Sequence, residues 1–381
     1  MQEIYLDNSA TTKPCDAAIT ACVQAMQQDY GNPSSLHRKG FEAEKVVIKA
    51  KQELAKALFC EPSEILFTSG ATESNNLAVV GSVLANKRKG NKIVTTAIEH
   101  PSVKETMKML QQQGYIIKEV FPREDGAFYE MDFFDEVDDQ TVLVSCMWVN
   151  NETGLILPIE KIAKAVKRKN PNTVVHVDAV QGFLKLSIKL KNNEIDLLSM
   201  SGHKVYAPKG IGALYIKKGI RLVPQTFGGN QQSGIRSGTE PTPLIAAFGA
   251  AVASQREQIS AVKERYQQLK DYFVEKLAEI PEVHINTKLD NSAPHILNIS
   301  IANIRSEVML HYLEQYGIYV SSGSACAKGK QSYVLAAFGL EKEYTDTAIR
   351  ISFSPDITIQ QLDYVTEQLK EGINTLAKIK R

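Results

Sequence analysis

The stretch that decides the fold is TVVHVDAVQ, residues 173–181. Its first five residues are mostly β-branched, which is typical of a short buried strand, and Asp178 stands where that strand ends. Amphipathic segments separate several further runs of this kind, found at 64–68, 92–97, 141–148, 195–201 and 212–216. Strands that alternate with amphipathic helices predict an α/β fold with a mostly parallel sheet covered on both faces.

The pattern changes towards the C-terminus. Residues 238–281 fit one very long helix, or two helices with a kink near 255, and strand-like runs with intervening helices follow at 295–301, 317–322 and 348–354. A chain of 381 residues is expected to form about two domains. We therefore predict a large domain at 16–255 and a smaller α+β domain formed by 1–15 together with 256–381.

Composition narrows the class of protein. Hydrophobic residues make up 43% and charged residues 23%, and the formal net charge of +1 gives no field that attracts nucleic acid. No secretory signal is visible, and no apolar run approaches the roughly 20 residues of a membrane helix. The five cysteines are scattered, which argues against a disulfide framework or a metal site: Cys15, Cys22, Cys60, Cys146 and Cys326. We expect a cytoplasmic protein without a metal.

Two charged residues near strand ends suggest a cofactor. Lys204, in SGHKVYAPKGIG (201–212), follows one strand-like run, and Asp178 ends another. A surface lysine and a helix-capping aspartate are the ordinary alternatives for each residue alone. Together they match pyridoxal 5'-phosphate, which needs a lysine for its aldehyde and a carboxylate to keep its ring nitrogen protonated. Gln181 is then placed to hydrogen-bond the phenolic oxygen of the ring.

Three other segments carry polar or reactive groups. In LFTSGATESNN (66–76) a helix is expected to begin at Ala71 and Thr72, where free N–H groups favour a phosphate, although many strand–helix turns look similar. No Walker loop and no G-x-G-x-x-G pattern follows a strand. His100 also follows a strand, either as a structural hydrogen-bonder or as a proton carrier stacked on a cofactor. In YVSSGSACAKGKQSYV (319–334), Cys326 is either an incidental loop residue or a thiol that the loop carries.

With these motifs assembled, the chain resembles the cysteine desulfurases of the class V aminotransferase superfamily, from YLDNSATT (5–12) to AIRISFS (348–354). The likeness includes GNPSSLH, TSGATESNN, EHPS, VNNETG, HVDAVQ, SGHK, GIRSGTE and SSGSAC. The SGSAC context is similar to the group I, NifS/IscS-type branch. The resemblance implies the pyridoxal-phosphate transferase fold type I, with a mostly parallel seven-stranded sheet in the large domain and a smaller α+β domain.

The resemblance also implies residue roles. Lys204 would bind the cofactor covalently, Asp178 and Gln181 would set its electronics, and His100 would stack on its ring. Asn151 would contact cofactor or substrate, and Arg350 would bind the substrate carboxylate, for which a bidentate pair is favourable. The phosphate would be bound by Ala71, Thr72, Ser201 and His203, together with Thr239 from the partner subunit of a homodimer.

The implied reaction converts L-cysteine to L-alanine and leaves the sulfur as a persulfide on Cys326. Lys328 and Lys330 would favour the thiolate form of Cys326. An acceptor protein would then take the sulfur, either an iron–sulfur scaffold or a tRNA-thiolation enzyme. The segment AKGKQ (327–331) is shorter than is usual in this branch and lacks the usual proline, so the acceptor stays open. The alternatives are an aminotransferase, a selenocysteine lyase or a non-catalytic sulfur-relay partner.

Overall fold

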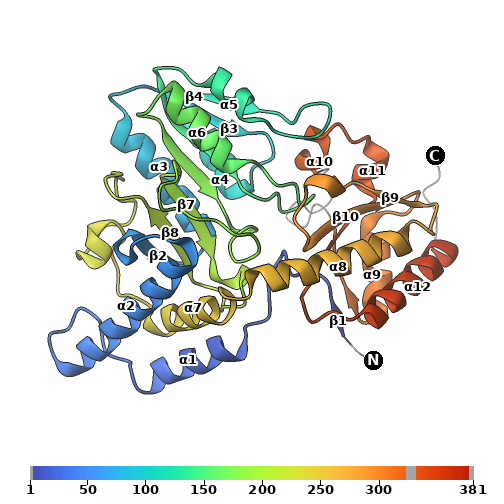
Figure 1. The fold of residues 1–381 in the computed structure, drawn as a ribbon, viewed down its shortest axis with the longest axis horizontal. Coiled ribbons are helices and arrows are strands. Elements are labelled where there is room, and N and C mark those ends of the chain that lie inside the picture. The colour runs from blue at the N-terminus through green and yellow to red at the C-terminus, as the bar shows by residue number, and fades with distance from the viewer. Residues whose placement is uncertain (1–2, 323–331, 377–381) are drawn as a thin grey trace.

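The fold is seen in a computed structural model, which describes residues 3–322 and 332–376 (Figure 1). Its centre is a seven-stranded sheet in the order β2-β8-β7-β6-β5-β3-β4. The strands are β2 (Ile65–Thr68), β3 (Lys92–Thr96), β4 (Ile116–Val120), β5 (Thr141–Met147), β6 (Val174–Asp178), β7 (Leu197–Ser201) and β8 (Gly212–Ile216). β8 runs antiparallel to both neighbours and the remaining pairs are parallel, so the predicted α/β fold is confirmed.

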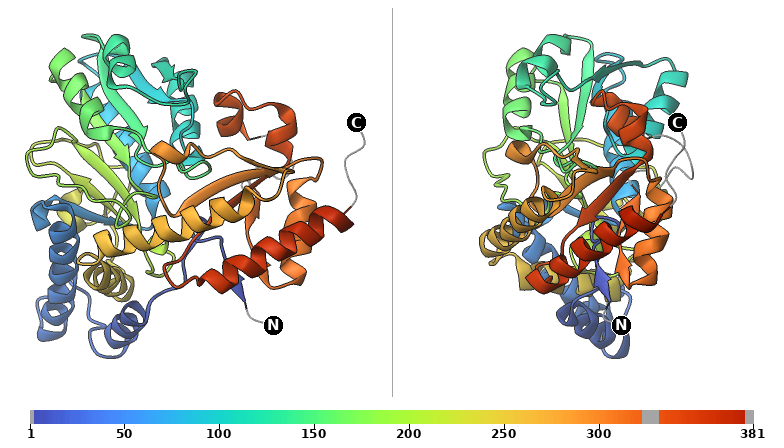
Figure 2. Two further views of the ribbon diagram at one scale, coloured as in Figure 1. Left: turned by 45° about the vertical axis from the view of Figure 1, so that its right-hand side comes forward. Right: turned by 90° about the vertical axis from the view of Figure 1, so that its right-hand side faces the viewer.

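Helices cover both faces of this sheet (Figures 1 and 2). Buried residues of α3 (Ala71–Asn86) and α4 (Pro101–Gln112) pack with one set of strand residues. A second cluster joins the opposite face to helices on that side: α2 (Arg38–Leu58), α6 (Ile159–Lys169) and α7 (Thr242–Gln255). Helices α1 (Asp16–Gln27) and α5 (Glu130–Glu136) lie further out, against α7 and α6 respectively. The sheet is therefore buried on both sides, as the apolar strands predict.

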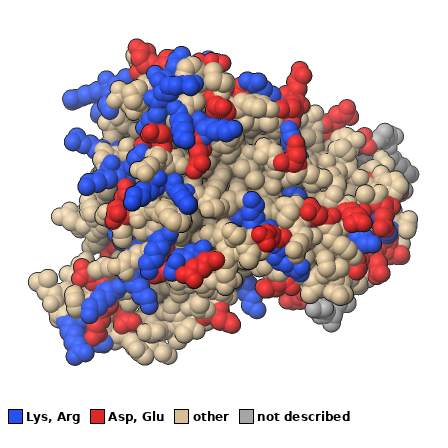
Figure 3. Space-filling model, in the orientation of Figure 1, with Lys and Arg blue, Asp and Glu red and all other residues tan. Residues whose placement is uncertain are grey.

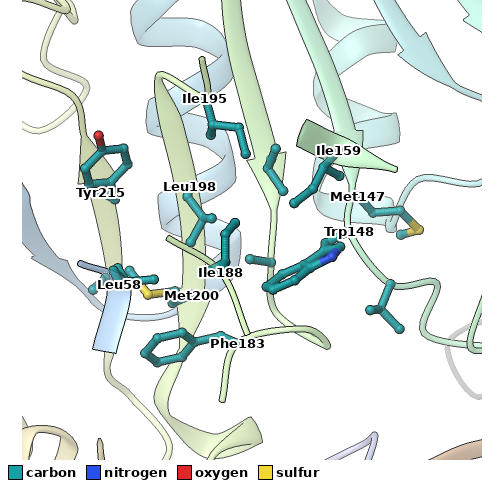
Figure 4. Packing of buried hydrophobic residues seen from close by; sticks show 14 of the residues in the cluster. Leu58, Met147, Trp148, Ile159, Phe183, Ile188, Ile195, Leu198, Met200 and Tyr215 are labelled. Carbon is teal, nitrogen blue, oxygen red and sulfur yellow. The ribbon is translucent and has the colours of Figure 1, made fainter. Parts of the chain in front are cut away.

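Figure 4 shows part of the second cluster, where Trp148 and Phe183 lie among side chains from β7, α6 and the connecting loops, such as Leu198, Ile159 and Ile188. Trp148 directly follows β5, and Phe183 follows the turn after β6. Because Trp148 and Phe183 belong to the loops after β5 and β6, their burial in this cluster fixes those loops at the carboxyl ends of the strands. Those loops are where ligands bind in sheets of this type.

The C-terminal part forms a second, smaller unit. Its antiparallel sheet has the order β12-β13-β10-β9. The strands are β9 (Val283–Ile285), β10 (Ile296–Ile301), β12 (Ser321–Ser322) and β13 (Ala348–Ser352). The helices are α8 (Ile259–Leu277), α9 (Ser306–Gln315), α10 (Tyr333–Ala337), α11 (Lys342–Asp346) and α12 (Ile359–Thr375). The 238–281 segment is thus two helices, because α7 ends at Gln255 and α8 begins at Ile259.

The N-terminus joins this smaller unit (Figure 2). β1 (Ile4–Tyr5) pairs in parallel with β11 (Ile318–Tyr319). Ile4 and Leu6 belong to the same buried cluster as apolar side chains between 266 and 373, while a separate cluster lies mostly within 18–252 and also includes Ala293, Ile296 and Val334. These two cores support the division into 16–255 and 1–15 with 256–381, which stays a prediction.

Short 3-10 turns complete the chain at 62–64, 202–204, 231–234 and 289–291. No helix within residues 3–322 and 332–376 is long and apolar enough to cross a membrane. The same ranges contain no cluster of three His, Cys, Asp or Glu side chains placed to hold a metal ion.

Charge is unevenly distributed although the net charge is only +1. Figure 3 shows Lys and Arg side chains gathered over the region of α6, and Asp and Glu side chains at the edge of the smaller unit. α6 buries an apolar stripe and ends with three basic residues, Lys167, Arg168 and Lys169. Cations in the last turn of a helix interact favourably with its dipole.

Candidate active site

A cavity of about 490 Å³ lies at the carboxyl ends of the central strands. Strand-end residues from β6 and β7, the first turn of α3 and Arg350 of β13 all face it. It brings together most of the predicted site residues: Ala71, Thr72, His100, Asn151, Asp178, Gln181, Ser201, His203, Lys204 and Arg350. Thr239 is exposed and does not line this cavity, and Cys326 lies outside the described residues.

Asp178 is held in place by a hydrogen-bonded network. Its Oδ2 accepts a hydrogen bond from Asn75 Nδ2 at 2.8 Å, and its Oδ1 accepts one from the backbone N–H of Val180 at 3.0 Å. Asn75, on α3, also donates to Ser102 Oγ at 2.9 Å, and that hydroxyl lies 2.8 Å from His100 Nδ1. Asp178 is only 5% exposed, and burying a carboxylate is unfavourable unless it has hydrogen-bond partners of this kind.

The same network defines the state of His100. The backbone N–H of Ser102 donates to His100 Nδ1 at 3.1 Å, so a neutral ring carries its proton on Nε2. Burial, followed by the positive charge of Lys204, lowers the pKa of His100, while Asp178 opposes this shift. His100 is therefore mainly neutral at pH 7 and has both a donor and an acceptor nitrogen.

Lys204 stands at the end of the 3-10 turn that follows β7. Its Nζ donates to the backbone carbonyls of Ser9 at 2.5 Å and Ala10 at 2.7 Å, and Gln181 Nε2 donates to the Ser9 carbonyl at 3.0 Å. The backbone N–H of Thr12 also donates to the carbonyl preceding Lys204, at His203, with a distance of 2.8 Å. The N-terminal segment therefore positions the lysine amine.

Arg350 has two partners of different kinds. Its Nη1 donates to the backbone carbonyl of Asn151 and its Nη2 to Asp7 Oδ1, both at 2.8 Å. Its Nε is buried and has no hydrogen-bond partner among the residues that the structure describes. The guanidinium thus retains donors beside the cavity, and a carboxylate is the acceptor that matches them.

Both flanks of the segment that contains Cys326 lie beside this cavity. On one side, Ser321 pairs with Arg350 across the β12–β13 ladder. On the other side, Ser332 Oγ donates to Glu152 Oε2 at 2.6 Å, and Glu152 directly follows Asn151. Burial raises the pKa of Glu152 to about 7.

The chain is similar in sequence to proteins of a known family. A family model described as aminotransferase class-V matches residues 4–365. The chain belongs to the class-V aminotransferase family. A cysteine desulfurase from Nostoc sp. (strain PCC 7120) is 38% identical over 379 residues, which cover 99% of this chain and 94% of that protein. The match places the chain in the cysteine desulfurase branch, as the sequence motifs predict.

Solved structures agree with this class-V assignment. A structure described as a NifS-like protein is 37% identical, with a TM-score of 0.93, and the match covers 98% of this chain and 100% of that chain. A second structure, SspA in complex with cysteine, is 32% identical with a TM-score of 0.82 and coverage of 93% and 99%. The class-V desulfurases depend on pyridoxal phosphate, which is the predicted cofactor.

The cavity fits that cofactor at its phosphate end. The first N–H groups of α3 have no partner within the helix and lie at its positive end. A side chain at Gly70 would meet nothing within 4 Å, so the backbone there is open to the cavity. Ser201 Oγ is buried without a hydrogen-bond partner in the described part of the chain. A phosphate oxygen would satisfy that hydroxyl.

His203 adds a neutral donor to the same region. Burial, followed by the charges of Lys204 and Lys209, lowers its pKa to about 4. Its Nδ1 lies 3.2 Å from Thr11 Oγ1. Nearby, Arg236 Nε is 2.8 Å from Glu73 Oε1, which ties the GIRSGTE segment to the first turn of α3.

Several residues of the site were not predicted from the sequence. Asn75 and Ser102 connect Asp178 to His100, and the carbonyls of Ser9 and Ala10 hold Lys204. Asn75 lies inside the TSGATESNN motif, so a polar residue on the cavity side of α3 was a signal that could have revealed it. The roles of the predicted residues themselves stay predictions.

Proposed function

We propose that the protein removes sulfur from L-cysteine, releases L-alanine and passes the sulfur on from Cys326. The observation that carries this proposal is the meeting of Lys204, Asp178 and Arg350 at one cavity in a class-V chain. An amine for the cofactor aldehyde, a carboxylate for its ring nitrogen and a guanidinium for the substrate carboxylate are what this chemistry needs.

Pyridoxal phosphate, when bound, supplies an electron sink for charge that develops on the substrate. Lys204 would hold the cofactor covalently through its amine and would move a proton to or from the substrate α-carbon. The Ser9 and Ala10 carbonyls keep the released ammonium near that carbon. Asp178, oriented by Asn75, would keep the ring nitrogen of the cofactor protonated.

Arg350 binds the substrate carboxylate, and Asn151 helps to orient the guanidinium through its backbone carbonyl. The Cys326 thiolate then attacks the substrate sulfur. A sulfur–sulfur bond forms, the bond from Cβ to sulfur breaks with its electron pair passing to Cβ, and Cβ takes up a proton. His100, neutral with a proton on Nε2, is a group that can donate or accept protons during these steps.

The first experiment separates the cofactor amine from the nucleophile. With dithiothreitol present, wild-type protein is expected to release sulfide and alanine in equal amounts from cysteine. Cys326→Ala is expected to keep the visible chromophore and lose both products, whereas Lys204→Ala loses the covalent chromophore as well. Cys22→Ala, on α1, is the matched control and should keep wild-type turnover. Full sulfide release by Cys326→Ala would remove Cys326 from the mechanism.

The same assay separates the other candidate activities. An aminotransferase consumes a 2-oxo acid and releases no sulfur, and a selenocysteine lyase acts on selenocysteine with Cys326 dispensable. A non-catalytic relay partner would show no visible absorption and yield no pyridoxal phosphate on extraction. Lys204 and Asp178 line the same cavity, which argues against the relay role.

We also propose a homodimer in which Thr239 reaches the partner's phosphate site. Large apolar side chains are exposed on neighbouring elements of one region, which is typical of an interaction surface: Met26, Tyr30, Leu36 and Phe41. Phe227, 81% exposed, lies on the loop that leads to Thr239. Light scattering should give twice the mass of one chain, and Phe227→Asp with Leu36→Asp should shift it to a monomer. A wild-type monomer would contradict this arrangement.

The sulfur acceptor is proposed to be a cytoplasmic protein, either an iron–sulfur scaffold or a tRNA-thiolation enzyme. Support comes from the flanks of the Cys326 segment, which lie beside the cavity and connect it to the smaller unit. Trapping a mixed disulfide with Cys326 in cell extract, followed by mass spectrometry, would identify the acceptor. Cys326→Ser should trap nothing.

A further inference from the structure

Arg350 already has an acidic partner at the proposed substrate site. The ion pair of its Nη2 with Asp7 Oδ1 is 2.8 Å long, and the two side chains are 7% and 21% exposed. A second terminal nitrogen, Nη1, donates to the Asn151 carbonyl. Acceptors on two different nitrogens of a planar fork fix its orientation, because rotation about its last bond would break at least one of these contacts.

One donor of this fixed group has no partner. Arg350 Nε is buried and unpaired among the described residues, and a buried donor without an acceptor is unfavourable. Arg350 as a whole is 6% exposed, so bulk water offers little compensation. Nη1 and Nη2 each carry a second N–H, and Arg350 lines the cavity, so the fixed group keeps donors for an acceptor that arrives there.

Asp7 is itself placed by strand contacts. The backbone N–H of Ser352 donates to the Leu6 carbonyl at 2.7 Å, and the N–H of Ser9 donates to Ser352 Oγ at 2.8 Å. Asp7 forms a parallel bridge with Ser352, two residues beyond Arg350 on the same strand. The register between these segments therefore sets where the Asp7 carboxylate stands.

The same segment also holds the second cation of the site. Two residues after Asp7, the Ser9 carbonyl accepts the hydrogen bond from Lys204 Nζ, and the Ala10 carbonyl accepts another. Residues 7–10 thus contact both the group that binds the substrate carboxylate and the amine that works at the α-carbon. The carboxylate carbon and the α-carbon of the substrate are joined by one bond, so the protein groups that act on them must be spaced accurately.

We propose that Asp7 is a positioning residue, which holds the Arg350 guanidinium in the orientation that binds the α-carboxylate of the amino-acid substrate. This proposal rests on the proposed function. For the Asp7→Ala variant it predicts a change in carboxylate affinity that is opposite to the change expected from charge alone. Removing the negative charge of Asp7 would, by charge alone, strengthen binding of a carboxylate to Arg350, whereas loss of orientation weakens it.

The test compares Asp7→Ala and Asp7→Asn in the cofactor-loaded protein. Asp7→Ala is expected to raise both the KM for L-cysteine and the Kd for L-alanine about ten-fold or more, which corresponds to about 1.4 kcal/mol. Asp7→Asn keeps an acceptor oxygen and should recover most of the affinity. The Kd of L-alanine is read from the change in cofactor absorbance. Asp290→Asn, an exposed aspartate of the smaller unit, is the control and should match wild type.

Two further measurements separate positioning from a merely structural ion pair. In an Arg350→Ala background, Asp7→Ala should add no further loss in L-alanine affinity, because Asp7 acts through Arg350. Cysteamine lacks the carboxylate, so its Kd should be the same for wild type and Asp7→Ala. The urea midpoint of each variant records any loss of stability separately.

Unchanged L-alanine affinity in Asp7→Ala, with only a lower urea midpoint, would overturn the proposal. Tighter L-alanine binding would overturn it as well, in favour of charge. Equal weakening for cysteamine would show a general disturbance of the site and reject the specific role. A failure of the proposed function is distinguishable, because wild-type protein would then form no alanine from cysteine whatever the effect of Asp7 on amino-acid binding.

Discussion

Replacing Lys185 by methionine is expected to stabilise the protein by an amount that depends on pH. Lys185 is 6% exposed, and within the described part of the chain it forms no ion pair. Its Nζ donates to Tyr266 Oη at 3.3 Å and lies 4.6 Å from the centre of the Tyr206 ring. Burial lowers the pKa of Lys185 from 10.5 to about 7. Tyr266 Oη retains a partner without Lys185, since Tyr206 Oη lies 3.0 Å away.

The sign and size of the expected change in stability follow from this lowered pKa. Between about pH 7 and pH 10.5 the unfolded chain binds more protons at Lys185 than the folded protein does, so stability rises with pH there and is lost as the pH falls towards 7. At 1.36 kcal/mol per pH unit, burial of the Lys185 amine destabilises the fold by roughly 5 kcal/mol at pH 6, where the amine is charged, and by roughly 2 kcal/mol at pH 9, where folding keeps it neutral. Methionine fills a similar volume without the charge.

The assay is urea unfolding of wild type and Lys185→Met at pH 6 and pH 9. The gain in unfolding free energy should be several kcal/mol at pH 6 and should be smaller by about 3 kcal/mol at pH 9. The matched control is Lys189→Met, an exposed lysine of the same connection, which should change stability by less than about 0.5 kcal/mol at either pH. A gain that is the same at both pH values, or a loss, would refute the reasoning.

Three other substitutions test separate features. Gly182→Ala would place Cβ 2.4 Å from a Trp148 ring carbon. We therefore expect the free energy of unfolding, measured with urea, to fall by roughly 1–3 kcal/mol. Ser201→Ala should weaken the binding of pyridoxal phosphate by about ten-fold, or 1.4 kcal/mol, in a cofactor titration. The affinity for pyridoxal, which lacks the phosphate, should be unchanged. Glu152→Gln removes a carboxyl whose raised pKa of about 7 makes the wild type less stable as the pH rises through 7. The variant should therefore gain up to roughly 3 kcal/mol over wild type between pH 5 and pH 8.

The sequence predicts the central sheet well because its strands are buried on both faces. The strands that were expected are apolar along their length, and the parallel arrangement brings Asp178 and Lys204 to the same edge. β4 was missed. It is an edge strand, IIKEV, of which only Val120 is buried, so it lacks the continuous apolar run that identifies the others.

The contacts that complete the site are less accessible to sequence reasoning. The hydrogen bond from Lys204 to the Ser9 carbonyl joins positions 195 residues apart through a backbone atom that every residue has. The pairing of Asp7 with Arg350 depends on the register between the N-terminal segment and β13. No local pattern encodes such a register, and it is determined only when both units have packed.

The position of the N-terminal segment also affects when the site can form during synthesis. Leu6 and Ser9 leave the ribosome more than 300 residues before Ser352, whose backbone N–H and hydroxyl hold them in place. Domains generally fold in order of their emergence, so the large sheet can assemble while its lysine still lacks the carbonyls that hold it. Tight binding of the vitamin-derived cofactor is therefore expected only after β13 has been synthesised. A chain that stops before β13 would have a site in which Lys204 is not held.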